Sequence, residues 1–337
     1  MDDLHARPSL TSHRWFDGVP IDSVGSSHVP RAQSCHAAAS SRPRLGACRI
    51  RGGYAVGKAG RGFVSNAAPD SSATSDVEAT ETMVAIGDAE LVMLTAGAGR
   101  PLVVFHDELG FSGWLQWTRD LAQHRQLLVP LQPGFGRTPR LEWTNDYRDL
   151  AAFYLRAIRE LELMPVDVIG FSAGGYIAAE MVAAHPQAFG RVALVAPLGL
   201  RPSEGEIFDF LAVTARRHLE ATVSNQDVPE IGAIYGGAMT PETFELFEAA
   251  RAETSRLGWE PFMFSPSLGE RLKGVDGVET LIVWGDTDRI VPRACVDEYA
   301  RVLRGSRLEV LTDCGHRPEI EATPRFSKLL NDFYFTP

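Results

Sequence analysis

The chain has 337 residues, of which 45% are apolar and 23% charged, close to the globular average, so collagen-like, fibrous and wholly disordered structures are excluded. Lys and Arg number 33 against 43 Asp and Glu, and the net charge of −10 would repel a phosphate backbone, so we expect no nucleic-acid partner. No apolar run approaches the roughly 18 residues that a membrane helix needs, so we expect no membrane span.

The cysteines indicate the compartment. Cys35, Cys48, Cys295 and Cys314 are too few and too scattered for a disulfide framework, and their spacing matches no zinc site. We therefore expect a reducing compartment, with the cytoplasm as the default location, and neither a metal nor a cofactor.

The first 78 residues differ in composition from the rest. Residues 24–68 contain no Asp or Glu but many Arg, Ser, Ala and Gly. This composition is typical of organelle transit peptides, and it also arises when upstream GC-rich DNA is translated from a misassigned start. We favour the second interpretation, with Met83 as the true start, and keep targeting as the alternative. In both cases residues 1–78 are expected to be disordered and to carry no chemistry.

After Thr82, short Leu-rich or β-branched runs alternate with helical patterns, which predicts an α/β fold with a mostly parallel sheet. A helix is expected after Asn145 as N-cap, because Tyr147, Leu150, Tyr154 and Ile158 share one face. The expected strands are 91–94, 102–105, 127–129, 166–169, 192–195, 281–284 and 308–311.

The stretch 201–276 is too long for a connection between two neighbouring strands. Its pattern is mainly helical, at Ile207–Leu219 and Pro241–Arg256. We therefore predict a helical cap at 201–276, with the core formed by 79–200 and 277–337.

A candidate nucleophile lies in Gly170-Phe171-Ser172-Ala173-Gly174, which follows the strand 166–169 and precedes the helical run 176–184. A sharp strand-to-helix turn leaves no room for a Cβ at the two glycines. Such a turn lifts the Ser172 hydroxyl above the sheet at a helix N-terminus, whose dipole favours negative charge.

A serine nucleophile needs a base, and the base needs an acid to hold it. The strand 281–284 is followed by Asp286 and Asp288, and the strand 308–311 is followed by His316. The chain order is therefore Ser, Asp, His, with both partners on loops after strands, where open parallel sheets bind their ligands.

With these motifs, residues 83–337 resemble the α/β-hydrolase fold superfamily, in the serine hydrolase branch with a helical cap after the sixth strand. The resemblance implies a mostly parallel eight-stranded sheet flanked by helices. It implies Ser172 as nucleophile, His316 of the Gly-His-x-Pro-x-x-Glu run as general base, and Asp288 as acid. Asp286 competes with Asp288, but the family places the acid three residues after the glycine that ends the strand, which is Asp288.

The resemblance also implies an oxyanion hole of two backbone N–H groups, those of Ala173 and Glu108. The loop reads His106-Asp107-Glu108-Leu109-Gly110, and Asp107 stands where relatives usually have glycine. In the interpretation we favour, both carboxylates leave the pocket and Asp107 binds nearby backbone. In the alternative, Glu108 faces the cavity with a raised pKa and acts as a second acid.

The remaining histidines have ordinary explanations: His106 is expected to hydrogen-bond within its loop, and His124, His185 and His218 are expected at the surface. An aromatic cluster in the predicted cap either lines the pocket or anchors the cap to the core, and we slightly favour anchoring. The candidate pocket residues are His106, Asp107, Phe111, Trp114, Phe171, Trp259, Phe262 and Met263.

We therefore expect a serine hydrolase that cleaves a carboxylic ester or a similarly activated acyl compound through an acyl-enzyme. The acidic chain favours a small neutral or apolar substrate. The alternatives are a carbon–carbon bond hydrolase of ring-cleavage products, a cofactor-free perhydrolase, and a small-molecule receptor without turnover. The sequence predicts no oligomeric state.

Overall fold

The computed structural model describes residues 78–228, 231 and 241–335. The predicted leader lies outside these residues, apart from Glu78. The strands are β1 (Ala79–Ile86), β2 (Ala89–Ala96), β3 (Pro101–Phe105), β4 (Gln126–Pro130), β5 (Val166–Phe171), β6 (Phe189–Val195), β7 (Glu279–Gly285) and β8 (Arg307–Leu311). The helices are α1 (Gln116–Ala122), α2 (Tyr147–Glu160), α3 (Ala173–Ala184), η1 (Pro186–Ala188), α4 (Ala215–Thr222), α6 (Pro241–Gly258), α7 (Leu268–Leu272), α8 (Arg293–Val302), α9 (Pro318–Glu321) and α10 (Thr323–Phe335).

The eight strands form one sheet in the order β1-β2-β4-β3-β5-β6-β7-β8. β2 pairs antiparallel with β1 and β4, whereas the strands from β4 to β8 are parallel. The prediction of a mostly parallel eight-stranded sheet is confirmed. Because these six strands point the same way, their carboxyl ends and the loops that follow them meet at one edge of the sheet.

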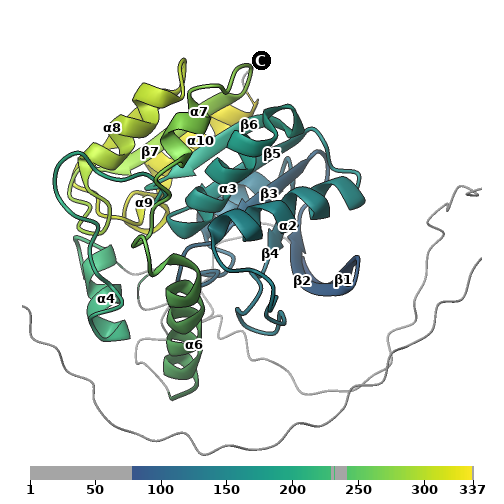
Figure 1. Cartoon of the computed structure of the whole chain (residues 1–337), viewed down its shortest axis with the longest axis horizontal. Coiled ribbons are helices and arrows are strands. Elements are labelled where there is room, and N and C mark those ends of the chain that lie inside the picture. The colour runs from purple at the N-terminus through teal and green to yellow at the C-terminus, as the bar shows by residue number, and fades with distance from the viewer. Residues whose placement is uncertain (1–77, 229–230, 232–240, 336–337) are drawn as a thin grey trace, which may run out of the picture. The chain divides into compact units, whose positions relative to one another are not determined.

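Helices cover both faces of this sheet. Alternate side chains of β3 belong to separate cores: Val103 packs with α2, α3 and α8, whereas Val104 packs with α1 and α10. Figure 1 shows α2 and α3 in front of the central strands. This two-sided burial explains why the central strands read as nearly continuous apolar runs.

The sequence missed one strand. Each predicted strand lies within β2 to β8, but β1 has no comparable apolar run, because nearly all its residues are exposed at the edge of the sheet. β1 pairs with β2 along its whole length, from Ala79 opposite Ala96 to Ile86 opposite Ala89. Met83 lies in the middle of β1, so a chain beginning there would lack the first half of this strand.

The start of α2 differs from the prediction by one residue. Its N-cap is Asp146, whose side chain accepts hydrogen bonds from the N–H groups of Arg148 and Asp149, both at 2.9 Å. The predicted cap, Asn145, instead donates its N–H to the Asp149 carboxylate at 2.8 Å. Both residue types cap helices well, so the sequence alone did not distinguish them.

Residues 196–278, between β6 and β7, are called the inserted segment below. The predicted helix at Ile207–Leu219 is wrong in its first half, because α4 begins only after Thr214, whose hydroxyl caps the N–H of Arg217 at 3.2 Å. The predicted helix at Pro241–Arg256 corresponds to α6, which is two residues longer. In Figure 1, α4 and α6 lie to one side of the sheet. Leu109, in the loop that follows β3, packs with Ala215, Leu219 and Phe247 of these helices.

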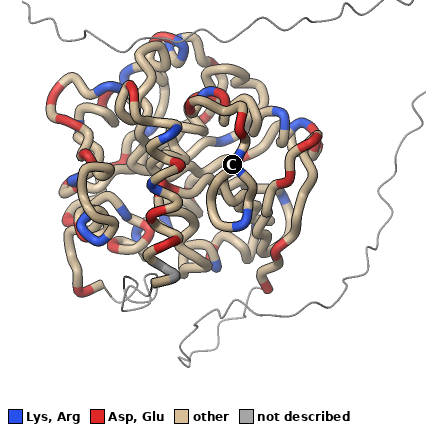
Figure 2. The backbone as a smooth tube through the Cα atoms, turned by 60° about the horizontal axis from the view of Figure 1, so that its bottom comes forward, with Lys and Arg blue, Asp and Glu red and all other residues tan. Residues whose placement is uncertain are grey.

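Acidic and basic residues are interspersed over the described body, with no large region of one sign in the view of Figure 2. Within the described ranges, no helix has the length and apolar character that crossing a bilayer requires.

Candidate active site

Ser172 occupies the turn between β5 and α3, where it is the N-cap of the helix. Its backbone has φ 46° and ψ −110°, a conformation that non-glycine residues rarely adopt. When they do adopt such a strained conformation, it is often at a functional site. Its N–H donates to the Val195 carbonyl of β6 at 2.9 Å, which holds the turn against the sheet. The side chain is buried, with the residue only 2% exposed.

The glycines around Ser172 leave no room for a side chain, as predicted. A Cβ on Gly174 would lie 2.3 Å from the Phe105 carbonyl oxygen, and one on Gly170 would lie 2.5 Å from the Gly174 carbonyl oxygen. These contacts involve backbone, which cannot easily yield. The start of α3 is therefore pressed against the end of β3, beside the loop that contains Glu108.

The structure brings Asp288, rather than Asp286, to His316. His316 Nδ1 donates to Asp288 Oδ2 at 2.9 Å, while Asp288 Oδ1 accepts the N–H groups of Ile290 and Val291 at 2.7 and 3.0 Å. Asp286 turns to the backbone of the neighbouring loop, where its Oδ1 accepts the N–H of Cys314 at 3.4 Å. With its proton on Nδ1, the imidazole has Nε2 left as a proton acceptor.

Several negative charges surround His316. Burial lowers the pKa of this histidine, but the charge and hydrogen bond of Asp288, together with the charges of Glu108 and Asp107, outweigh burial and raise the pKa to about 9. The His316 N–H donates to the carbonyl of Thr222, the last residue of α4, at 2.9 Å. The inserted segment thus contacts the loop that carries this histidine.

Glu108 forms a buried pair with His218 from α4, at 3.1 Å between Oε1 and Nε2. His218 is fully buried and stacks on Phe210, with ring centroids 4.6 Å apart and an interplanar angle of 10°. The expectation that His218 lies at the surface is therefore wrong, whereas His124 and His185 are exposed as predicted. Helical spacing was the available signal, since His218 lies one turn from the buried Ala215 and Thr222.

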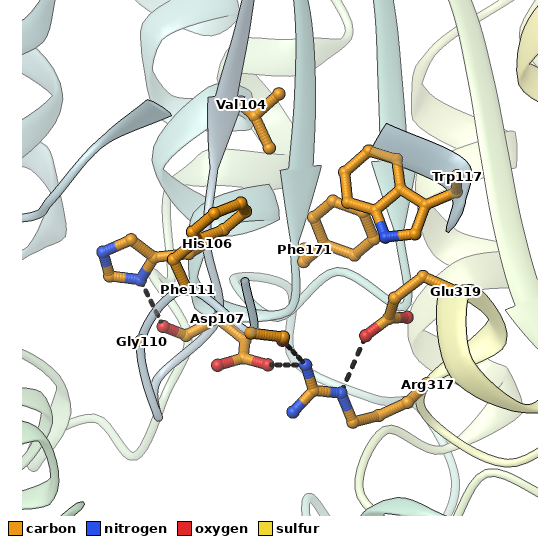
Figure 3. A pocket seen from close by; sticks show the side chains of 10 residues that line it. Val104, His106, Asp107, Gly110, Phe111, Trp117, Phe171, Arg317 and Glu319 are labelled. Atoms are coloured by element: carbon orange, nitrogen blue, oxygen red, sulfur yellow. Dashed lines mark hydrogen bonds and ion pairs between the residues drawn. The ribbon is translucent and has the colours of Figure 1, made fainter. Parts of the chain in front are cut away.

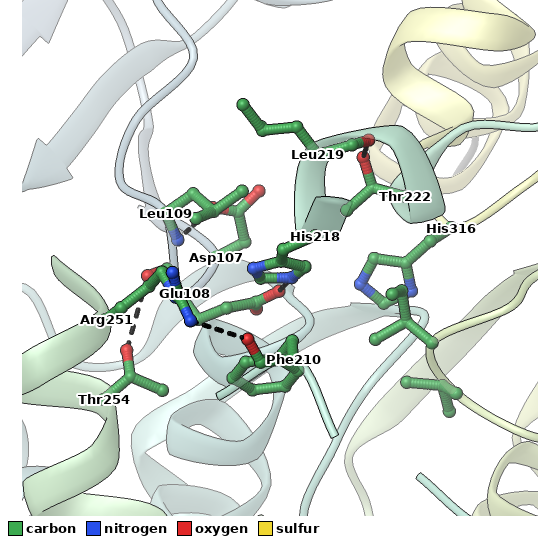
Figure 4. A network of polar contacts seen from close by, with 12 residues as sticks. Asp107, Glu108, Leu109, Phe210, His218, Leu219, Thr222, Arg251, Thr254 and His316 are labelled. Carbon is green, nitrogen blue, oxygen red and sulfur yellow. Dashed lines mark hydrogen bonds and ion pairs between the residues drawn. The ribbon is translucent and has the colours of Figure 1, made fainter. Parts of the chain in front are cut away.

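The structure contradicts one part of each interpretation of Glu108: that its carboxylate leaves the pocket, and that its pKa is raised. The carboxylate does not leave the site: Figure 4 shows it pointing toward the rings of His218 and His316. Its pKa is not raised either. Burial acts to raise it, but the hydrogen bond and charge of His218 and the charge of His316 hold the pKa well below its usual range.

Asp107 does bind nearby backbone, as expected, and it also forms an ion pair that the sequence did not reveal. Its Oδ1 accepts the Leu109 N–H at 2.9 Å, and its Oδ2 lies 3.0 Å from a guanidinium nitrogen of Arg317. Arg317 also pairs with Glu319 at 2.7 Å and donates to the hydroxyl of Ser112, and Figure 3 shows it between the two carboxylates. Burial raises the pKa of Glu319 in spite of Arg317.

His106 hydrogen-bonds within its own neighbourhood. Its Nε2 accepts the Gln132 N–H at 3.0 Å and its Nδ1 donates to the Asp107 carbonyl at 2.8 Å, so the ring is held as the neutral tautomer. Burial lowers its pKa, which agrees with a neutral ring. This histidine supports the loop.

A small pocket lies beside the loop that follows β3. Its lining residues are Val104, His106, Asp107, Gly110, Phe111, Ser112, Trp117, Phe171, Arg317 and Glu319. Four of the candidate pocket residues are among them. Trp114 instead packs edge-on against Phe111, with ring centroids 5.2 Å apart.

The candidate pocket residues of the inserted segment do not line this pocket. Trp259 is 60% exposed and is not among the residues that line this pocket. Met263 is fully buried in the main core, and the ring of Phe262 packs against Phe210 with centroids 5.5 Å apart. These contacts agree with the anchoring interpretation for Met263 and Phe262.

Glu321 of the Gly-His-x-Pro-x-x-Glu run connects the His316 loop with the inserted segment. Its Oε2 accepts the Gly315 N–H at 2.7 Å, and its Oε1 accepts the N–H groups of Ser224 and Asn225 at 2.7 and 2.9 Å. Among the residues that the structure describes, no group of three His, Cys, Asp or Glu side chains is arranged to hold a metal ion.

Comparison with known proteins places the chain in a family. The model of the alpha/beta hydrolase family matches residues 102–328. The protein is therefore an enzyme that belongs to the alpha/beta hydrolase family.

The individual relatives share less than a third of their residues with this chain. The chain is 28% identical over 268 residues to the 2-hydroxy-6-oxo-2,4-heptadienoate hydrolase of Pseudomonas putida, covering 74% of this chain and 95% of that protein. It is 27% identical to the 2-hydroxymuconate semialdehyde hydrolase of a Pseudomonas species, covering 71% and 88%. The meta-cleavage product hydrolase of Pseudomonas fluorescens IP01 has a similar structure, with a TM-score of 0.63 at 22% identity over 75% of this chain and 97% of that one. A bacterial membrane phospholipase A superposes with a TM-score of 0.64 at 21% identity, covering 76% and 85%. These structural likenesses establish the fold alone.

Proposed function

We propose that the enzyme is a serine hydrolase in which the Ser172 hydroxyl attacks a carbonyl carbon. The observation that carries this proposal is the hydrogen bond between Asp288 and His316, which leaves Nε2 of the imidazole to take a proton at the edge of the sheet where Ser172 sits on a strained turn. In this proposal His316 is the general base, and Asp288 fixes its tautomer and stabilises the imidazolium that forms.

The attack converts the carbonyl oxygen into an oxyanion, which needs hydrogen-bond donors. We assign these donors to the backbone N–H groups of Ala173 and Glu108. Ala173 is the first residue of α3, so its N–H has no partner inside the helix and the helix dipole favours an anion there. When the tetrahedral intermediate collapses, the imidazolium of His316 protonates the leaving group, and water then hydrolyses the acyl-enzyme by the same route in reverse.

For the substrate we propose a carboxylic ester or a similarly activated acyl compound. The second candidate is hydrolysis of a carbon–carbon bond, in which His316 would protonate a carbon leaving group. The names of two relatives support this candidate, since they are hydrolases of 2-hydroxy-6-oxo-2,4-heptadienoate and of 2-hydroxymuconate semialdehyde. We expect a higher kcat/KM for uncharged esters than for such dienoates, and assays of both classes on one preparation would show which candidate holds.

Labelling with a fluorophosphonate followed by peptide mass spectrometry tests the role of Ser172. We expect stoichiometric modification at Ser172, none in Ser172→Ala, and normal labelling in Ser327→Ala, which removes another buried serine hydroxyl from α10. A folded protein that is never labelled, or that is labelled elsewhere, would contradict the proposed function and favour a receptor without turnover.

A further inference from the structure

Glu108 brings a charged side chain, and not only a backbone N–H, to the candidate nucleophile. The residue is 1% exposed, and its loop lies against the start of α3, where a Cβ on Gly174 would lie 2.5 Å from the His106 carbonyl oxygen. An acyl group bonded to Ser172 Oγ would therefore lie beside the loop that carries this carboxylate.

The carboxylate is held in place from the inserted segment. His218 of α4 binds Oε1, and the ring of His218 is itself fixed by stacking on Phe210. Thr254 of α6 donates its hydroxyl to the Glu108 carbonyl at 3.3 Å. Because α4 holds the carboxylate and α6 holds the backbone of the same residue, the side chain cannot turn away from an incoming substrate without breaking the buried contact with His218.

One oxygen of this carboxylate is not used. Glu108 Oε2 is buried, and neither it nor Ser172 Oγ has a hydrogen-bond partner in the described part of the chain. A buried carboxylate oxygen without a donor is costly, so buried polar groups normally have partners, and exceptions are frequent at functional sites. A donor group on a bound substrate would satisfy Oε2.

The cations around Glu108 are already engaged. His218 and His316 face the carboxylate itself. The terminal nitrogens of Arg251 on α6 donate to three carbonyls of the inserted segment and to Glu248. Arg317 pairs with Asp107 and Glu319. A second carboxylate, brought in by a substrate, would meet Glu108 in a buried site where like charges repel strongly.

We propose that Glu108 determines substrate specificity. Its carboxylate accepts a hydrogen bond from a neutral or cationic donor group, such as a hydroxyl, near the reacting carbonyl of the substrate. The same carboxylate excludes substrates that carry a carboxylate at that position. The inference rests on the proposed attack by Ser172. If it holds, this enzyme differs in substrate preference from the relative named as a hydrolase of the anionic 2-hydroxy-6-oxo-2,4-heptadienoate.

Arylboronic acids test the inference without requiring turnover, because they form tetrahedral adducts with a nucleophilic serine. Three phenylboronic acids, substituted at position 3 with methyl, hydroxymethyl or carboxylate, are compared by how well each protects Ser172 from fluorophosphonate labelling at one pH. For the wild-type protein we expect the hydroxymethyl compound to bind at least tenfold more tightly than the carboxylate compound, with the methyl compound between them.

The variant Glu108→Gln removes the charge while keeping the size, and we expect the hydroxymethyl-to-carboxylate ratio to fall below threefold. Glu180→Gln is the matched control, because Glu180 is also buried but pairs with Arg271 on the side of α3 away from this loop, so the ratio should not change. If Glu108→Gln does not fold, the wild-type ratio decides alone.

Provided that Ser172 still labels, four outcomes would each overturn the inference. They are equal binding of the three compounds, protection by none of them, tighter binding of the carboxylate compound, and an unchanged ratio in Glu108→Gln. A wild-type protein that does not label at all would instead overturn the proposed function, and the inference with it.

Discussion

At the scale of single residues, the charge state of His316 controls the proposed chemistry. Asp288 follows β7, whereas Glu108 and Asp107 follow β3, and these carboxylates together raise the pKa of His316 to about 9 against the effect of burial. A general base works only when it is unprotonated. The raised pKa favours the imidazolium, which cannot take the proton of Ser172, up to a higher pH than is usual for histidine.

We expect kcat/KM, and the rate of fluorophosphonate labelling, to rise about tenfold per pH unit through neutral pH and to level off near pH 9. Glu108→Gln removes one of the charges that favour the imidazolium, so the rise should move to lower pH. This account would be contradicted if the wild-type rates did not change between pH 6 and 9. It would also be contradicted if the rise in Glu108→Gln occurred at the same pH as in the wild-type protein. Glu180→Gln, remote from His316, serves as the control.

The two aspartates after β7 provide a matched pair. Asp288→Asn keeps the size but removes the charge beside His316 Nδ1, and loss of the acid in such triads lowers kcat by about 10⁴, a value measured in another serine hydrolase. Asp286→Asn should change kcat less than tenfold, because in the described part of the chain the hydrogen bond of this side chain is to the backbone of Cys314 and not to His316. Steady-state kinetics on one ester decides, and a larger loss in Asp286→Asn would reverse the assignment.

At the scale of elements, the site depends on how closely α3 approaches β3. The turn at Ser172 is sharp because no side chain separates Gly174 from the end of β3. The same approach places the Ala173 N–H beside the loop that carries Glu108. Local backbone geometry, and not only the identity of the nucleophile, thus determines where an oxyanion could be bound.

Gly174→Ala should therefore destabilise the protein by about 1–3 kcal/mol, because the added methyl group would overlap the carbonyls of Phe105 and His106. It should also slow the labelling of Ser172. Gly274→Ala is the control: its nearest contact would be a carbonyl 3.7 Å away, so the change should stay within about 0.5 kcal/mol. Urea unfolding measures both, and equal values for the two variants would be the contrary result.

At the scale of the whole molecule, every residue described at the site lies between positions 104 and 321. We expect a variant that lacks residues 1–77 to keep kcat/KM within twofold of the full chain. A variant that begins at Met83 loses the pairs from Ala79 to Thr82 in β1, and it should unfold at lower urea concentration with unchanged kcat/KM. A loss of activity on removal of residues 1–77 would show that the leader contributes to the site.

The parts of the fold that the sequence predicted well are those with strong local patterns. The central strands are buried on both faces and read as apolar runs, and the apolar face of α2 has clear helical spacing. β1 was missed because an exposed edge strand needs no such pattern. The helix predicted at Ile207–Leu219 was too long, because Thr214 caps the true start and the residues before it pack without helical backbone.

The sequence by itself determined the strands β2 to β8, the helix α2, the glycine-lined turn at Ser172, and the presence of an aspartate and a histidine on later loops, because these features depend on neighbours along the chain. The tertiary structure decided that Asp288 contacts His316, that Glu108 turns into the site and that His218 is buried against it. Glu108 and His218 are 110 positions apart, so their contact depends on how the inserted segment packs on the core, which no local pattern encodes.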